Sequence, residues 1–159
     1  MVIGILLTII AIITISIAVR RHVVKGHSTV SFAEAMDLVE LPIITVQNNN
    51  TKINLLLDTG SNSSYISPNV LKDLEYDEIK LSNTTIGFGG GATHTKGCFM
   101  KIKYKKLTFE DTFIIMQSDD IFSAIKQECG VQVHGILGSK FFDRYSYVID
   151  FGDLVAYVK

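Results

Sequence analysis

The chain has 159 residues, of which 47% are hydrophobic, and a formal net charge of −1, which suits one domain of ordinary size with its own core. A charge so close to zero offers no electrostatic basis for binding nucleic acid, so no nucleic-acid partner is expected. Two cysteines, Cys98 and Cys129, do not make a disulfide framework, and without a CxxC or His/Cys cluster they predict buried thiols, no metal site and no cofactor.

The N-terminal residues 2–19 contain no charged residue and no proline. Eighteen helical residues reach about 27 Å at roughly 1.5 Å each, enough to cross the hydrocarbon core of a bilayer. We therefore expect a transmembrane helix over residues 1–19. Ser16-Ile17-Ala18 also resembles a signal-cleavage site, but the positive charges follow the apolar run, between residues 20 and 25. This order favours an uncleaved, single-pass anchor with the remaining chain in the cytoplasm, and a cleaved signal is the alternative.

Residues 20–40 are typical of a juxtamembrane linker, and Ser31-Phe32-Ala33-Glu34 predicts a capping box that opens a short helix to about Val39. From there on, residues 41–159 form one predicted domain that is mostly β. The alternating segment 101–106 predicts a solvated edge strand. The other expected strands are 43–47, 52–57, 98–104, 113–117, 147–151 and 154–158, and short helices are expected from Ser67-Pro68 to Leu74, over 119–128 up to Gly130, and over 139–144.

Asp58-Thr59-Gly60 comes directly after the apolar run Ile53–Leu57. An ionised carboxylate avoids apolar surroundings unless it is paired or hydrogen-bonded, so this position indicates a functional site. Gly60 permits a tight turn, and nearby hydroxyl groups can hold the carboxylate in place. We expect an aspartate at the tip of a loop that a rigid strand presents, which suits catalysis by a carboxylate. A capping aspartate in an ordinary turn is the alternative.

The segment Leu56-Leu57-Asp58-Thr59-Gly60-Ser61 resembles the active-site motif of the aspartic proteases. Ile136-Leu137-Gly138 resembles the apolar pair and glycine that pack beneath the catalytic loop in that family, and Val148-Ile149-Asp150-Phe151 follows it as an IDF-type strand. Between them, Phe88-Gly89-Gly90-Gly91-Ala92 lies where the family has its flap, although a glycine-rich phosphate loop is the alternative. The similarity covers residues 41–158 and is closest to the single-domain retropepsin-like branch, including membrane-anchored bacterial members.

The resemblance implies a retropepsin-like acid protease fold, a closed barrel-like lobe with short helices, and the activity of an aspartic endopeptidase. Aspartic proteolysis needs two carboxylates that share one proton, yet the DTG motif occurs once in this chain. The second carboxylate is therefore expected from a second copy, which predicts a homodimer that acts on peptide substrates. By the resemblance, Asp58 is catalytic, its loop is supported by Thr59, Gly60, Ser61, Ile136, Leu137 and Gly138, and the substrate is covered by Phe88, Gly89, Gly90, Gly91 and Ala92.

Further details follow from the same resemblance. Thr59 is expected to join the two catalytic loops by reciprocal hydrogen bonds, and Ser61 to hydrogen-bond near the outer carboxylate oxygen. Leu154–Lys159 is a candidate for the interfacial sheet. Ser139 departs from the retroviral members, which usually carry a charged or amide residue after the glycine.

Two other functions remain open for this sequence. One is a non-catalytic retropepsin-like module used for dimerisation or peptide binding, because a fold alone does not imply activity. The other is a self-processing enzyme that cleaves its own linker near residues 20–40. His94 and His134 are expected to be surface or packing histidines, and Asp119-Asp120 the acidic N-terminus of a helix.

Overall fold

The computed structural model describes residues 29–81, 96–116 and 119–159. The predicted membrane segment, residues 2–19, and the predicted flap, residues 88–92, lie outside the described residues. Within the part that is described, no helix is long and apolar enough to cross a membrane.

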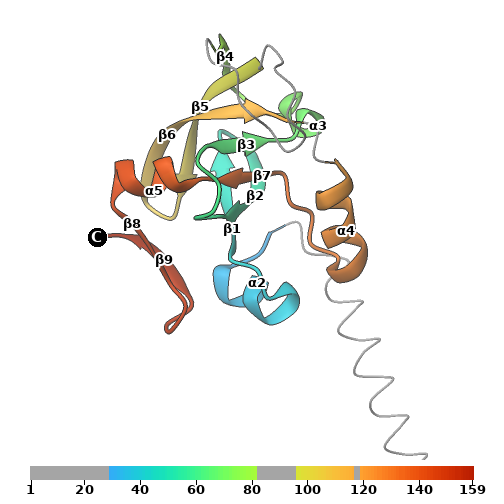
Figure 1. The fold of residues 1–159 in the computed structure, drawn as a ribbon, viewed down its shortest axis with the longest axis vertical. Helices are drawn as coiled ribbons and strands as arrows, with labels where there is room; N and C mark the ends of the chain where they lie inside the picture. Colours follow the sequence, from blue (N-terminus) through green and yellow to red (C-terminus); the bar gives the residue numbers. More distant parts are fainter. Residues whose placement is uncertain (1–28, 82–95, 117–118) are drawn as a thin grey trace, which may run out of the picture.

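The first described helix, α2 (Phe32–Val39), begins at the predicted capping box. The Ser31 hydroxyl accepts a hydrogen bond from the Glu34 amide at 3.2 Å, and the Glu34 carboxylate accepts one from the Ser31 amide at 2.8 Å. These two bonds satisfy amides that the first turn of a helix leaves free. The buried residues of the helix, Phe32 and Ala35, face the barrel, so α2 closes the end of the barrel at β1 (Figure 1).

Seven strands form one sheet, and six of them close into a barrel. The order is β1-β2-β7-β3-β6-β5-β4, and an additional pairing between Gln47 of β1 and Lys103 of β5 completes the circuit (Figure 1). With this pairing, each of those six strands has a neighbouring strand on both sides over at least part of its length. The expected closed, mostly β lobe is confirmed. Its strands are β1 (Ile43–Asn48), β2 (Thr51–Leu57), β3 (Ser64–Ile66), β4 (Asp77–Lys80), β5 (Lys96–Tyr104), β6 (Leu107–Ile115) and β7 (Gly135–Leu137).

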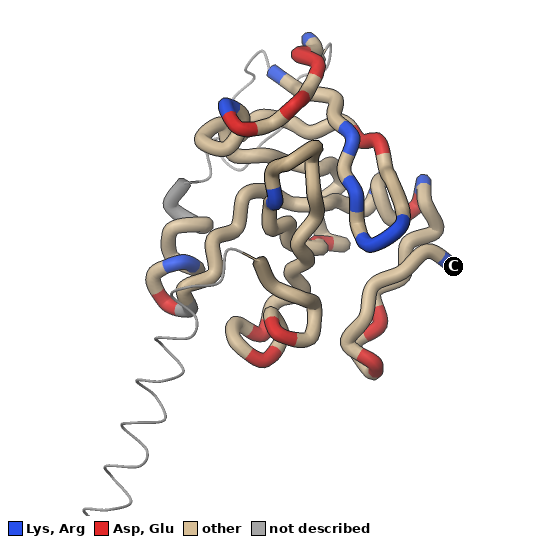
Figure 2. Tube along the Cα trace, turned by 180° about the vertical axis from the view of Figure 1, so that it is seen from behind, with Lys and Arg blue, Asp and Glu red and all other residues tan. Residues whose placement is uncertain are grey.

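The lysine-rich segment of β5 differs in part from the prediction of a solvated edge strand. Figure 2 shows its basic residues gathered along the β5–β6 hairpin, where Lys101 and Lys103 are exposed and Ile102 is buried. The solvated face is therefore confirmed. The prediction of an edge strand is wrong, because β5 pairs along most of its length with β6 on one side and, at its two ends, with β4 and β1 on the other.

Three short helices and a hairpin complete the described structure: α3 (Pro68–Leu71), α4 (Asp119–Cys129), α5 (Ser139–Tyr145), β8 (Tyr147–Asp150) and β9 (Val155–Val158). Helix α3 ends before the predicted Leu74, because the amides of Asp73 and Leu74 bond three residues back and tighten the last turn. Strand β4 was not predicted. Strand β6 begins six residues earlier than predicted, at Leu107.

An aromatic cluster fixes α5 against β6 and β8. Phe109 packs edge-to-face on Phe141, Tyr145 and Tyr147 with ring centroids 5.3, 4.9 and 5.8 Å apart, and such pairs add to the stabilisation from burial. Cys98, on the neighbouring β5, is fully buried, and burial raises the pKa of its thiol to about 12. The prediction of a buried thiol is thus confirmed for Cys98. The packing leaves α5 firmly placed beneath the loop that follows β2.

Candidate active site

Asp58 lies immediately after β2 and opens a tight turn. Its amide donates to the Leu137 carbonyl at 3.0 Å, and its carbonyl accepts from the Ser61 amide at 3.2 Å. The carboxylate oxygen Oδ1 accepts a hydrogen bond from the Gly60 amide at 2.9 Å. The Asp58 side chain is half-buried, whereas Thr59 and Gly60 are exposed. The loop thus holds one carboxylate oxygen by its own backbone and presents the side chain at the surface of the chain.

The segment Ile136-Leu137-Gly138 lies directly beside the Asp58 loop, as the sequence predicted. Strand β7 runs parallel to β2, with Leu56 opposite Ile136 and Leu57 opposite Leu137. On its other side β7 is antiparallel to β3, with Tyr65 opposite Ile136. Strand β7 is therefore inserted between the strand that enters the Asp58 loop and the strand that leaves it.

Gly138 supports the underside of the loop because it has no side chain. A Cβ atom there would lie 2.4 Å from the Ser63 carbonyl oxygen and 2.9 Å from that of Ser61. The next amide, of Ser139, donates to the Ser61 carbonyl at 2.7 Å. The loop therefore rests on the start of α5 through backbone contacts, one of them made by the Ser139 amide.

The hydrogen-bond partner of the Ser61 hydroxyl differs from the expected one, the Asp58 carboxylate. In the single chain the hydroxyl donates to the Ser63 carbonyl at 2.8 Å. The bond closes the loop on itself, and the amide of Gly60 takes the place beside the Asp58 carboxylate. Ser61 therefore stabilises the shape of the loop in the single chain.

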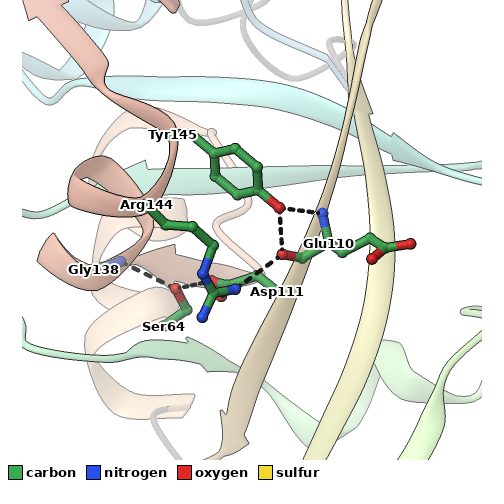
Figure 3. Close-up of polar contacts among 6 residues, drawn as sticks. All are labelled: Ser64, Glu110, Asp111, Gly138, Arg144 and Tyr145. Carbon is green, nitrogen blue, oxygen red and sulfur yellow. Dashed lines mark hydrogen bonds and ion pairs between the residues drawn. The ribbon is translucent and has the colours of Figure 1, made fainter.

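A polar network beneath the loop was not predicted from the sequence (Figure 3). The Ser64 hydroxyl donates to Asp111 Oδ2 at 2.6 Å and accepts from the Gly138 amide at 3.2 Å, and Arg144 Nη1 donates to Asp111 Oδ1 at 3.2 Å. Burial raises the pKa of Asp111, opposed by its bonds to Ser64 and the Thr112 amide and by the Arg144 charge. Asp111 occupies an inward position of β6, where an apolar residue is expected, and no strand was predicted there from the sequence.

A cavity of 360 Å³ lies at the opposite end of β7 from Asp58. Its lining includes Ser67, Lys72, Asp73, Phe122, Gln132 and His134. His134 was expected to be a surface or packing residue, and its Nδ1 accepts a hydrogen bond from the Asn54 amide at 3.0 Å. Burial lowers the pKa of His134, opposed by the hydrogen bond with the Asn54 backbone, and the charge of Lys126 lowers it further. The ring therefore holds β2 against the segment that leads into β7.

The described residues contain no group of three or more His, Cys, Asp or Glu side chains placed to hold a metal ion. The chemistry that this arrangement offers is that of a carboxylate with one oxygen held by an amide. Such a group can accept a proton from water or donate one, according to its protonation state.

A family model described as aspartyl protease matches residues 44–141. The matched range holds both Asp58-Thr59-Gly60 and Ile136-Leu137-Gly138, the two segments that β2 and β7 bring together. No protein among the curated sequences matches this chain.

The solved structures that are similar to the chain include two proteases and one protease-like domain. The EIAV protease complexed with the inhibitor HBY-793 is 24% identical, with 69% of this chain and 92% of that one covered and a TM-score of 0.48. The retroviral protease-like domain of Ddi1 from Leishmania major is 12% identical, with coverages of 75% and 88% and a TM-score of 0.49. A retropepsin-like aspartic protease from Rickettsia conorii is 17% identical, with coverages of 68% and 74% and a TM-score of 0.43.

Proposed function

The chain belongs to the aspartyl protease family and is an aspartic-type peptidase, and from this premise we propose that it acts as a homodimeric endopeptidase whose catalytic dyad is Asp58 from each of two copies. The observation that carries the proposal is the Asp58 loop itself. One carboxylate, with Oδ1 held by the Gly60 amide, is presented by a loop whose next two residues are exposed. The motif occurs once in the chain, so a second carboxylate requires a second copy.

The reaction follows from two such carboxylates that share one proton. The ionised Asp58 takes a proton from water as the water oxygen attacks the carbonyl carbon of the scissile bond, and the protonated Asp58 of the second copy donates to the carbonyl oxygen. Collapse of the tetrahedral intermediate breaks the C–N bond, and the amine leaves with the proton that the first carboxylate had taken. One hydroxyl group of the intermediate returns its proton to the second carboxylate, so that the new carboxyl group forms and the dyad again shares one proton. No cofactor is required at any step.

The C-terminal hairpin is a candidate surface for contact with the second copy. Strands β8 and β9 form a two-stranded sheet of their own, and a two-stranded hairpin with free edges is marginally stable alone. Phe151, Tyr157 and Val158 are exposed on it. The hairpin follows directly on α5, the helix whose start carries the Asp58 loop. A dimer that forms through the two hairpins would therefore hold the two Asp58 loops near the interface.

Three further parts of the proposal concern residues 88–92 and 2–19, which the structure does not describe, and the linker, which it describes only from residue 29 onward. Residues 88–92 would close over an extended peptide, which would bind by adding a strand to the sheet. Residues 2–19 would tether the enzyme to a membrane, with the catalytic domain on the cytoplasmic side. The linker near residues 20–40 would be a substrate if the enzyme processes itself.

The experiment compares the full-length chain, purified in detergent, with Asp58→Asn on a peptide library from pH 4 to 7, with and without a pepstatin-like inhibitor. We expect cleavage by the wild type only, and its loss with the inhibitor. Activity that survives the substitution would refute the mechanism. A wild type that binds peptides without cleaving them would support the alternative, a non-catalytic peptide-binding module. Mass spectrometry of the same sample would reveal any cleavage within the linker.

A further inference from the structure

One peptide group connects the backbone of Asp58 to the polar network beneath it. The carbonyl of Leu137 accepts from the Asp58 amide at 3.0 Å. The amide of Gly138, which belongs to the same peptide group, donates to the Ser64 hydroxyl at 3.2 Å. The described ladder between β3 and β7 ends at Tyr65 and Ile136. Beyond that pair, a side chain of β3 therefore supplies the acceptor that the backbone does not.

The hydrogen bonds all point in one direction. From the Asp58 amide, each donor passes to the next acceptor through the Leu137–Gly138 peptide group and the Ser64 hydroxyl and ends at Asp111. The short 2.6 Å bond from Ser64 to Asp111 is the charge-assisted member of the series. Hydrogen bonds aligned head to tail polarise and strengthen one another, most of all where an ion terminates them.

The burial of the Asp111 carboxylate is energetically unfavourable. It is 4% exposed and lies between the buried Phe109 and Phe113 on the inward face of β6. A buried carboxylate with one arginine partner is often no more stabilising than an apolar residue of similar size. Stability alone therefore gives a weak reason for the charge, whereas the directed series of hydrogen bonds gives a specific one.

We propose that Asp111, through Ser64 and the Leu137–Gly138 peptide group, is a positioning residue that holds the Asp58 loop in its catalytic geometry. The inference rests on the proposed function, since Asp58 is its catalytic residue. Arg144 places Asp111 by its bond to Oδ1, and the same guanidinium group also donates to the Glu110 carbonyl at 3.2 Å (Figure 3). In this chain, Arg144 brings its positive charge to the network from the last turn of α5, whereas Ser139, after the glycine, is uncharged.

The test uses Ser64→Ala, which removes both hydrogen bonds of the hydroxyl, and Asp111→Asn, which keeps the shape and removes the charge. Tyr145→Phe is the matched control. It breaks the bonds of the Tyr145 hydroxyl with the Glu110 amide and carbonyl, at 2.9 and 2.8 Å, which also join α5 to β6 but lie outside the series. All variants are made in the full-length chain in detergent.

Three quantities are measured: kcat and KM for one peptide, the melting temperature, and hydrogen–deuterium exchange of peptides that cover residues 55–60 and 136–140. We expect Ser64→Ala to lower kcat about tenfold, the equivalent of one lost charge-assisted hydrogen bond, with KM changed less than about twofold. Asp111→Asn should lower kcat by a smaller factor, and both should speed exchange at the two segments. Tyr145→Phe should lower the melting temperature but leave kcat and this exchange at their wild-type values.

A Ser64→Ala enzyme with wild-type kcat and a lowered melting temperature would overturn the proposal and leave the network a packing role. An equal loss of kcat in Tyr145→Phe would do the same. If the wild type cleaves no peptide, the proposed function fails separately, and exchange then decides: faster exchange at residues 55–60 in Ser64→Ala supports the positioning role, and unchanged exchange refutes it.

Discussion

Gly138 lies so close beneath Ser63 that a Cβ atom at position 138 would be 2.4 Å from the Ser63 carbonyl oxygen and 2.5 Å from its carbonyl carbon. Both neighbouring atoms belong to the backbone, so no side-chain rotation could make room. The height of the Asp58 loop above α5 is therefore set by the absence of a side chain at one residue.

Gly138→Ala should consequently displace the loop and lower both stability and activity. Overpacking of a close-packed site costs about 1–3 kcal/mol of the free energy of unfolding, which denaturant titration would measure. Gly152→Ala is the control, because its Cβ would meet only a flexible carboxylate oxygen, of Asp150, at 3.2 Å. Equal stability of the two variants would show that the loop does not rest on Gly138.

Mixing experiments should reveal the shared dyad. If each active site needs Asp58 from two copies, an equal mixture of wild type and Asp58→Asn leaves roughly a quarter of the dimers with both carboxylates, so activity per wild-type chain falls to about half once subunits have exchanged. The same amount of an unrelated protein should have no effect. Activity per wild-type chain that stays constant at every mixing ratio would show that one chain carries a complete site.

The exposed hairpin should control dimer formation. Tyr157 is 43% exposed on β9, and Tyr157→Lys should raise the dissociation constant of the dimer about tenfold, as for a buried aromatic anchor of an interface. Tyr76→Lys is the matched control, since Tyr76 is 39% exposed but precedes β4. Sedimentation across a concentration series would compare the two. Equal dissociation constants in both variants would place the interface elsewhere.

Local sequence signals correctly predicted the features that depend only on nearby residues, which are helix ends and tight turns. The Ser31–Glu34 capping box, the turn after Asp58 and the end of α4 at Gly130, whose φ is 75°, all depend on residues within a few positions. Family resemblance then supplied the pairing of the Asp58 loop with Ile136-Leu137-Gly138, which local propensity does not report.

Asp111 shows what the sequence could not indicate. Its role depends on Ser64, 47 residues before it, and Arg144, 33 residues after it. The glutamate and the aspartate at residues 110 and 111 are side chains that strands usually lack, and the predicted strand began only at residue 113. Only the closure of the barrel places one of the two carboxylates inside and leaves the other, Glu110, exposed beside Lys101 at 3.2 Å.

Acidification should destabilise the protein through His134. Burial, with a contribution from Lys126, holds the pKa of His134 below its ordinary value of 6.5, so the unfolded chain binds the proton more readily than the folded one. The stability that depends on the neutral ring is present above pH 6.5 and is lost as pH falls through the lowered pKa. His134→Asn, which can still accept from the Asn54 amide, should flatten the dependence of the melting temperature on pH in this range. An unchanged pH dependence would show that His134 is not its source.

Asp111 should produce the opposite slope at lower pH. Burial raises its pKa above the ordinary value of 3.8, even though Ser64, the Thr112 amide and Arg144 oppose the shift. The folded chain therefore binds this proton more readily than the unfolded chain, and the contribution of Asp111 to stability falls as pH rises from 3.8 through the raised pKa. The asparagine of Asp111→Asn does not titrate. As pH rises across that interval, the melting temperature of the wild type should therefore fall relative to that of the variant. Glu110→Gln, which removes an exposed carboxylate beside Lys101 on the neighbouring strand, is the matched substitution for comparison. A wild-type slope in Asp111→Asn would mean that the buried carboxylate does not titrate in this interval, and that Arg144 favours its charged form more strongly than burial opposes it.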